Sequence, residues 1–124
     1  MTNYVLVALG GGLGAALRYW LQGLVHARTG AGFPYGTLAV NVFGCLVIGV
    51  LMVSFEERFL ATPGLRLFLT VGILGGFTTF SSFSYETLAL SRDGDFLLAL
   101  ANVGFSVVSC LLATWAGMRI GRWI

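Results

Sequence analysis

The feature this sequence most conspicuously lacks is charge. Its 124 residues include no lysine and a single histidine, and 10% are charged, where about 25% is usual for a soluble domain. Seven arginines against five acids leave a net charge of +2, too small to indicate nucleic-acid binding. Hydrophobic residues make up 57% of the chain and the mean hydropathy is +0.90. This composition indicates an integral membrane protein.

Clusters of groups suited to redox or metal chemistry are also missing. The apolar stretches contain no lysine, aspartate or histidine, and their charges, Arg18 and Glu86, lie near expected span ends. Cys45 and Cys110 lack a metal-binding spacing, so we interpret them as small packing residues. A metal or redox enzyme needs His, Cys or carboxylate clusters, and a proton-coupled pump needs a titratable group near the midplane. We therefore expect a protein that is not an enzyme.

Four apolar stretches are long enough to cross a bilayer, whose core of about 30 Å needs about 20 helical residues. They predict an all-α membrane protein in which residues 1–124 form a single four-helix unit, with spans at about 4–25, 36–55, 67–90 and 96–118. The N-terminus has no positive region and the first stretch has Arg18 rather than a small-residue cleavage site, so we expect a retained span instead of a signal peptide.

The arginines are distributed weakly between the two expected membrane faces. One face would hold Arg58, Arg66, Arg119 and Arg122, and the other Arg28 and Arg92. Since positive residues concentrate on the cytoplasmic side, this bias favours inside termini only slightly. A chain with so small a bias is able to insert in both orientations.

Glycines four residues apart occur in three of the four segments, as Gly10 with Gly14, Gly72 with Gly76, and Gly117 with Gly121. In lipid, small residues at this spacing let helix backbones approach closely. The spacing predicts a packed bundle and indicates no particular function.

The third span contains the most unusual stretch, from Gly75 to Glu86. It carries two adjacent glycines, six hydroxyl groups and a carboxylate within an apolar run. Backbone polar groups must be satisfied inside a membrane, so such a stretch is tolerated only against protein or a wet cavity. We predict a helix broken near Gly75–Phe80, of the kind that builds ion sites from freed carbonyls.

Small polar residues form stripes at helical spacing on three spans. The members are Thr37, Asn41 and Gly44; Asn102, Ser106 and Ser109; and Thr79, Phe80, Ser82, Phe83 and Glu86. One interpretation is interhelical hydrogen bonding, worth about 1 kcal/mol per contact, with packed phenyl rings. The other is a path for a small anion, because amide and hydroxyl donors and the positive edges of phenyl rings suit one. The stripes alone leave both interpretations open.

Three motifs in order resemble those of the Fluc family of fluoride channels, also called CrcB proteins. They are Gly11–Tyr19 (GGLGAALRY) on the first span, Gly36–Gly44 (GTLAVNVFG) on the second and Gly75–Ser84 (GGFTTFSSFS) at the expected break. Length and four-span layout also agree, so the resemblance covers nearly the whole chain.

The resemblance implies a fluoride-selective passive channel of the bacterial inner membrane, built as an antiparallel, dual-topology homodimer. It implies a structural sodium ion at the dimer interface, held by the backbone carbonyls of Gly75 and Thr78. It further implies a vestibule with Arg18 and Glu86 and a fluoride pore lined by Asn41, Phe80, Phe83, Thr79, Ser82, Ser106 and Ser109. Which fourth-span residues face the pore, Asn102 included, stays open.

Two alternative functions fit a small four-span chain. A small multidrug transporter needs a buried carboxylate, usually in the first span, where this chain has Arg18 and no acid. A noncatalytic subunit of a larger membrane assembly would pass no ion when isolated.

Overall fold

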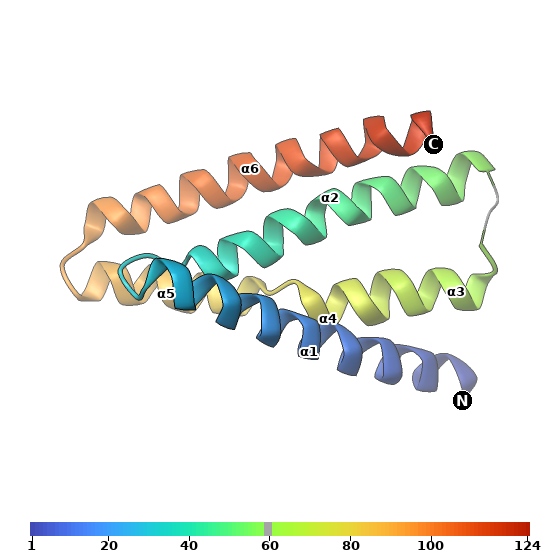
Figure 1. Ribbon diagram of the computed structural model, residues 1–124, viewed down its shortest axis with the longest axis horizontal. Helices are drawn as coiled ribbons and strands as arrows, with labels where there is room; N and C mark the ends of the chain where they lie inside the picture. The colour runs from blue at the N-terminus through green and yellow to red at the C-terminus, as the bar shows by residue number, and fades with distance from the viewer. Residues whose placement is uncertain (59–60) are drawn as a thin grey trace.

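The computed structural model describes residues 1–58 and 61–124, and it contains four helical segments long and apolar enough to cross a membrane. Three of them are the continuous helices α1 (Thr2–Thr29), α2 (Tyr35–Arg58) and α6 (Phe96–Trp123). Successive segments alternate in direction, so both termini lie at the same end of the bundle (Figure 1). The described residues contain no strand, which confirms the predicted all-α, four-span fold class. Residues 59 and 60 of the connector expected at 56–66 lie outside the described part.

The remaining segment is interrupted. It consists of α3 (Pro63–Leu67), the π-helical η1 (Phe68–Leu74), α4 (Gly75–Phe77) and α5 (Phe80–Arg92). Between α4 and α5 the backbone is extended, with φ −82° and ψ 156° at Thr78 and φ −150° and ψ 110° at Thr79. The break predicted near Gly75–Phe80 is thus confirmed. Gly75 and Gly76 themselves stay helical, so the chain leaves the helix after the glycine pair.

Gly76 of this pair, together with Gly72, Gly10 and Gly14, allows the interrupted segment to pack closely on α1. A Cβ added at Gly76 would overlap the carbonyl oxygen of Gly11, and one added at Gly14 would overlap that of Ile73. A Cβ at Gly10 would lie 2.9 Å from the Cα of Gly72. These two backbones approach as closely as the glycine spacing predicts.

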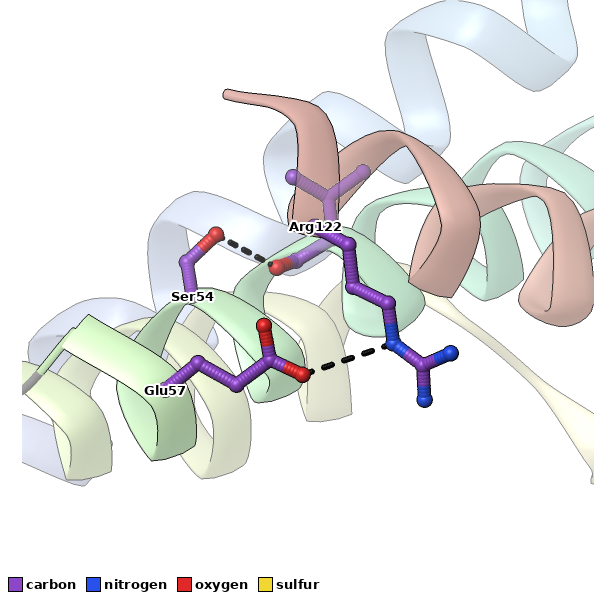
Figure 2. Close-up of polar contacts among 4 residues, drawn as sticks. Ser54, Glu57 and Arg122 are labelled. Atoms are coloured by element: carbon purple, nitrogen blue, oxygen red, sulfur yellow. Dashed lines mark hydrogen bonds and ion pairs between the residues drawn. The ribbon is translucent and has the colours of Figure 1, made fainter.

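The pair formed by α2 and α6 is the most extensively packed, and it also depends on glycine. A Cβ at Gly49 would overlap the carbonyl of Thr114, and one at Gly117 that of Leu46. At the far end of this pair, the Nε of Arg122 lies 3.4 Å from an oxygen of Glu57 (Figure 2). The hydroxyl of Ser54 donates to the Val50 carbonyl in the same view.

Polar side chains are buried as deeply as the small apolar core. The buried apolar residues are Val40, Val53, Phe55, Leu74, Phe77 and Ala99. The buried polar residues are Thr37, Thr79, Asn102 and Ser106, with Asn102 only 2% exposed. Large apolar side chains such as Leu97 and Leu111 instead cover the outside, where lipid would solvate them. The inside of the bundle therefore holds polar as well as apolar side chains.

Candidate functional site at the helix break

Asn41 of α2 holds the break open. Its Oδ1 accepts the Thr79 N–H at 2.8 Å, and its Nδ2 donates to the Thr79 carbonyl at 3.0 Å. Its Oδ1 thereby replaces the backbone partner that the Thr79 N–H would have in a continuous helix, and its Nδ2 adds a second donor to the Thr79 carbonyl, which as an N-cap carbonyl already accepts the first bond of α5. An amide NH₂ carries two donor hydrogens, so one N–H of Asn41 stays available to a further acceptor.

Thr79 starts the helix that follows the break. It is 6% exposed, and its Oγ1 accepts the N–H of Ser82 at 3.3 Å as an N-cap. The same hydroxyl donates to Ser82 Oγ at 3.1 Å and lies 3.3 Å from Ser81 Oγ. Hydroxyl caps are favoured because they satisfy the free N–H groups of a helix start.

A cavity of about 430 Å³ lies beside the break and contains most of the predicted pore residues. Among its lining residues are Asn41, Thr79, Phe80, Phe83 and Ser106. The rings of Phe80 and Phe83 are 5.4 Å apart and inclined at 48°, and Phe80 is 78% exposed. The structure thus gathers amide, hydroxyl and phenyl groups around a single hollow.

A second cavity, of about 380 Å³, is lined by Gln22, Thr37, Ser82 and Glu86 among others. The Thr37 hydroxyl donates to Glu86 Oε1 at 2.8 Å, and Gln22 Nε2 donates to the Thr37 hydroxyl at 3.2 Å. Glu86 Oε2 is buried and has no hydrogen-bond partner among residues 1–58 and 61–124. Sequence reasoning found Thr37 and Glu86 but not their contact.

The carbonyls predicted to hold sodium lie at the break and are poorly satisfied within the chain. The Thr79 N–H, which would bond the Gly75 carbonyl in a continuous helix, donates to Asn41 instead. Among residues 1–58 and 61–124, the one hydrogen bond found for the Thr78 carbonyl is a long one of 3.4 Å from Nη1 of Arg18. Arg18 therefore lies against the break, and within the described part of the chain it lines neither cavity.

The three polar residues of the α6 stripe have different partners. Asn102 Nδ2 donates to Thr87 Oγ1 at 2.9 Å, and the Ser106 hydroxyl, 8% exposed, donates to Asn102 Oδ1 at 3.4 Å. The Ser109 hydroxyl donates to the carbonyl of Phe105 on its own helix, and among the described residues it is not part of either cavity wall. The sequence did not single out Thr87, because its importance depends on a contact with Asn102 of a different helix.

Comparison with known proteins finds similarity along almost the whole chain. Residues 5–118 match the family model described as CrcB-like protein, Camphor Resistance (CrcB). The chain is 50% identical over 122 residues to a protein of Geobacter sulfurreducens, with 98% of each chain covered, and that relative is named fluoride-specific ion channel FluC.

Proteins with the same name occur in Geotalea uraniireducens and Rhodospirillum rubrum. The first is 48% identical over 98% of both chains, and the second is 47% identical over 93% of this chain and 91% of its own. Family model and relatives each span nearly the whole chain, which therefore belongs to the CrcB family.

Proposed function

We propose that this chain is the subunit of a passive, fluoride-selective channel of the bacterial inner membrane that exports cytoplasmic fluoride. The observation that carries the proposal is the series of donors beside the break. Ser82 lies in one cavity, its hydroxyl contacts Thr79, and Thr79 and Asn41 line the other cavity. Polar groups therefore follow one another from cavity to cavity. The printed names of the relatives support fluoride as the ion.

The chemistry of this series suits a small anion. The second N–H of Asn41 and the hydroxyls of Thr79 and Ser82 are donors, and the phenyl edges of Phe80 and Phe83 carry partial positive charge. Selectivity over chloride would follow from the narrow spacing of these donors. Net movement needs no coupled energy source, because an inside-negative potential drives an anion out by about 2.3 kcal/mol per 100 mV.

The functional unit in this proposal is an antiparallel homodimer with a structural sodium ion. One chain offers the carbonyls of Gly75 and Thr78, and hard cations take several oxygen ligands. An inverted second copy doubles this set by two-fold symmetry and would cover the open cavity around the exposed Phe80. The weak arginine bias permits the opposite insertions that this assembly requires.

Fluoride efflux from proteoliposomes, recorded with a fluoride electrode beside a chloride control, tests the function. We expect rapid fluoride release and negligible chloride release. Equal chloride release, or no fluoride release from well-folded protein, would contradict the proposal, and the second result would favour a noncatalytic assembly subunit.

The ion and the dimer need a separate test. Purification with sodium replaced throughout by a large organic cation should lower the bound-sodium content measured by atomic emission and shift the protein from dimer to monomer. Dimers of unchanged stability without bound sodium would remove Gly75 and Thr78 as ligands.

A further inference from the structure

The chain has two cysteines, Cys45 on α2 and Cys110 on α6, and these two helices pack together. These helices run in the same direction (Figure 1), and the close approach of Gly49 to Thr114 fixes their register. Cys45 and Cys110 each lie four residues, about one helical turn, before those contact points. Both cysteines accordingly lie at the same level of the α2–α6 pair, and both line the same cavity.

The thiols are accessible from the cavity beside the break. Both are free and partly exposed, and both line the hollow that also contains Asn41 and Phe83. Most of the surrounding wall is apolar, with Ile48 and Leu74 among the lining residues. Once deprotonated, the two sulfurs offer no N–H or O–H donor to stabilise a charge, unlike Asn41 and Thr79 at the break, so a neutral dithiolate complex is favoured there.

We propose that Cys45 and Cys110 form a binding site for a soft divalent metal ion of low coordination number, for which Hg²⁺ is the probe. Each S–H bond gives up its proton to solvent as a sulfur–metal bond forms. One Hg²⁺ and two thiols thus give one neutral dithiolate complex and two protons. No electron is transferred, and no co-reactant is needed.

The number of ligands and the charge of the complex exclude Zn²⁺ and Cu⁺ from this cysteine pair. Zn²⁺ in a structural site takes four protein ligands, and residues 1–58 and 61–124 contain no group of three or more His, Cys, Asp or Glu able to hold a metal. Cu⁺ with two thiolates would keep a negative charge in the apolar wall. Soft ions prefer thiolate ligands, so a soft divalent ion that is satisfied by two sulfurs fits this pair best.

Binding would also affect ion flow, and this part rests on the proposed function. The dithiol shares its cavity with Asn41, Phe80 and Phe83, so a metal held there narrows the proposed fluoride path. Hg²⁺ should therefore block efflux in proportion to occupancy of the site, while the binding itself requires no channel activity.

The site is tested by titrating purified protein with Hg²⁺ in chloride-free buffer that contains a competing monothiol, following sulfur-to-metal charge-transfer absorbance. We expect one equivalent to bind per chain. Cys45→Ser and Cys110→Ser each leave one thiol and serve as matched controls. Each should bind about 100-fold more weakly or worse, because the second contact of a chelate acts at high effective concentration.

A measurement on the native chain keeps the test independent of these variants. One equivalent of Hg²⁺ should protect both cysteines from maleimide alkylation, detected by mass spectrometry. Protection of one cysteine alone, or unchanged affinity in either folded serine variant, would overturn the site. Binding without any fluoride flux would leave the site intact and contradict the channel, so the two failures are distinguishable.

Discussion

The two helix pairs of this molecule share one packing device and differ in continuity. On α2 and α6 the glycines Gly49 and Gly117 meet backbone of the partner helix, and on α1 and the third segment Gly14 and Gly76 do the same. The first pair is helical throughout, whereas the second is interrupted at Thr78 and Thr79. Close glycine packing therefore does not itself break a helix.

The difference lies in where the backbone hydrogen bonds go. In α2 and α6, small hydroxyl groups such as those of Ser54 and Thr114 donate to carbonyls within their own helix. At the break, the Thr79 N–H and carbonyl bond to Asn41 on a different helix. The interruption is tolerated because a neighbouring side chain satisfies the Thr79 N–H that it frees.

Replacing Asn41 with aspartate should have the largest effect. The carboxylate can still accept from the Thr79 N–H but cannot donate to the Thr79 carbonyl, and it places a negative charge beside the proposed fluoride path. Like charges 4 Å apart repel by about 4 kcal/mol at an effective dielectric constant of 20. A barrier raised by this amount lowers a rate roughly a thousand-fold. Asn41→Asp should therefore reduce fluoride efflux from proteoliposomes by about that factor.

Asn41→Leu separates the effect of lost hydrogen bonds from the effect of added charge. It removes both bonds to Thr79 and adds no charge. It should lower the melting temperature more than Asn41→Asp does, because the Thr79 N–H loses the acceptor that aspartate would keep. Unchanged flux in the aspartate variant would remove Asn41 from the pore lining.

A methyl group at a contact glycine should destabilise either pair. Gly14→Ala would push against the Ile73 carbonyl, and Gly117→Ala against that of Leu46, at about 1–3 kcal/mol each. We expect a lower melting temperature in both. Efflux per folded protein should fall mainly in Gly14→Ala, since that change displaces the interrupted segment.

Gly12→Ala on α1 and Gly104→Ala on α6 are the matched controls, because a Cβ at either position meets no heavy atom within 4 Å. Both should resemble the native protein in stability. If Gly117→Ala reduced efflux as strongly as Gly14→Ala, the continuous α2–α6 pair would matter for ion flow as much as α1 and the interrupted segment do, which would contradict the comparison.

The fold and the approximate break could be predicted because their signals are local. Long uncharged runs specify spans, and hydroxyl groups after the Gly75–Gly76 pair mark where a helix is weakened. The partners at the break could not be predicted in this way. Asn41 and Thr79 are 38 residues apart, and Arg18 and Thr78 are 60 apart. Their contacts depend on the register between helices, which local sequence does not encode.

Thr79→Val should have a moderate effect. Valine keeps the shape but removes the hydroxyl that caps α5, a loss of about 1 kcal/mol. Thr62→Val is the matched control, because Thr62 caps α3 through Leu65 N–H at the same 3.3 Å but lies outside both cavities as described. Only Thr79→Val should also slow efflux, since its hydroxyl joins the donor series. Equal flux losses in both variants would indicate that capping, and not the donor, matters.

The smallest effect should come from the ion pair at the end of the α2–α6 pair. Glu57 and Arg122 are 3.4 Å apart, but their side chains are 50% and 49% exposed, and solvent-exposed pairs contribute about 0–1 kcal/mol. Glu57→Gln and Arg122→Gln should each leave efflux unchanged and shift the melting temperature only slightly. That result would mean that α2 and α6 are held together by the backbone contacts at Gly49 and Gly117, where no side-chain charge takes part. A loss as large as that of Gly117→Ala would mean that charge at the helix ends, and not close packing, stabilises the continuous pair.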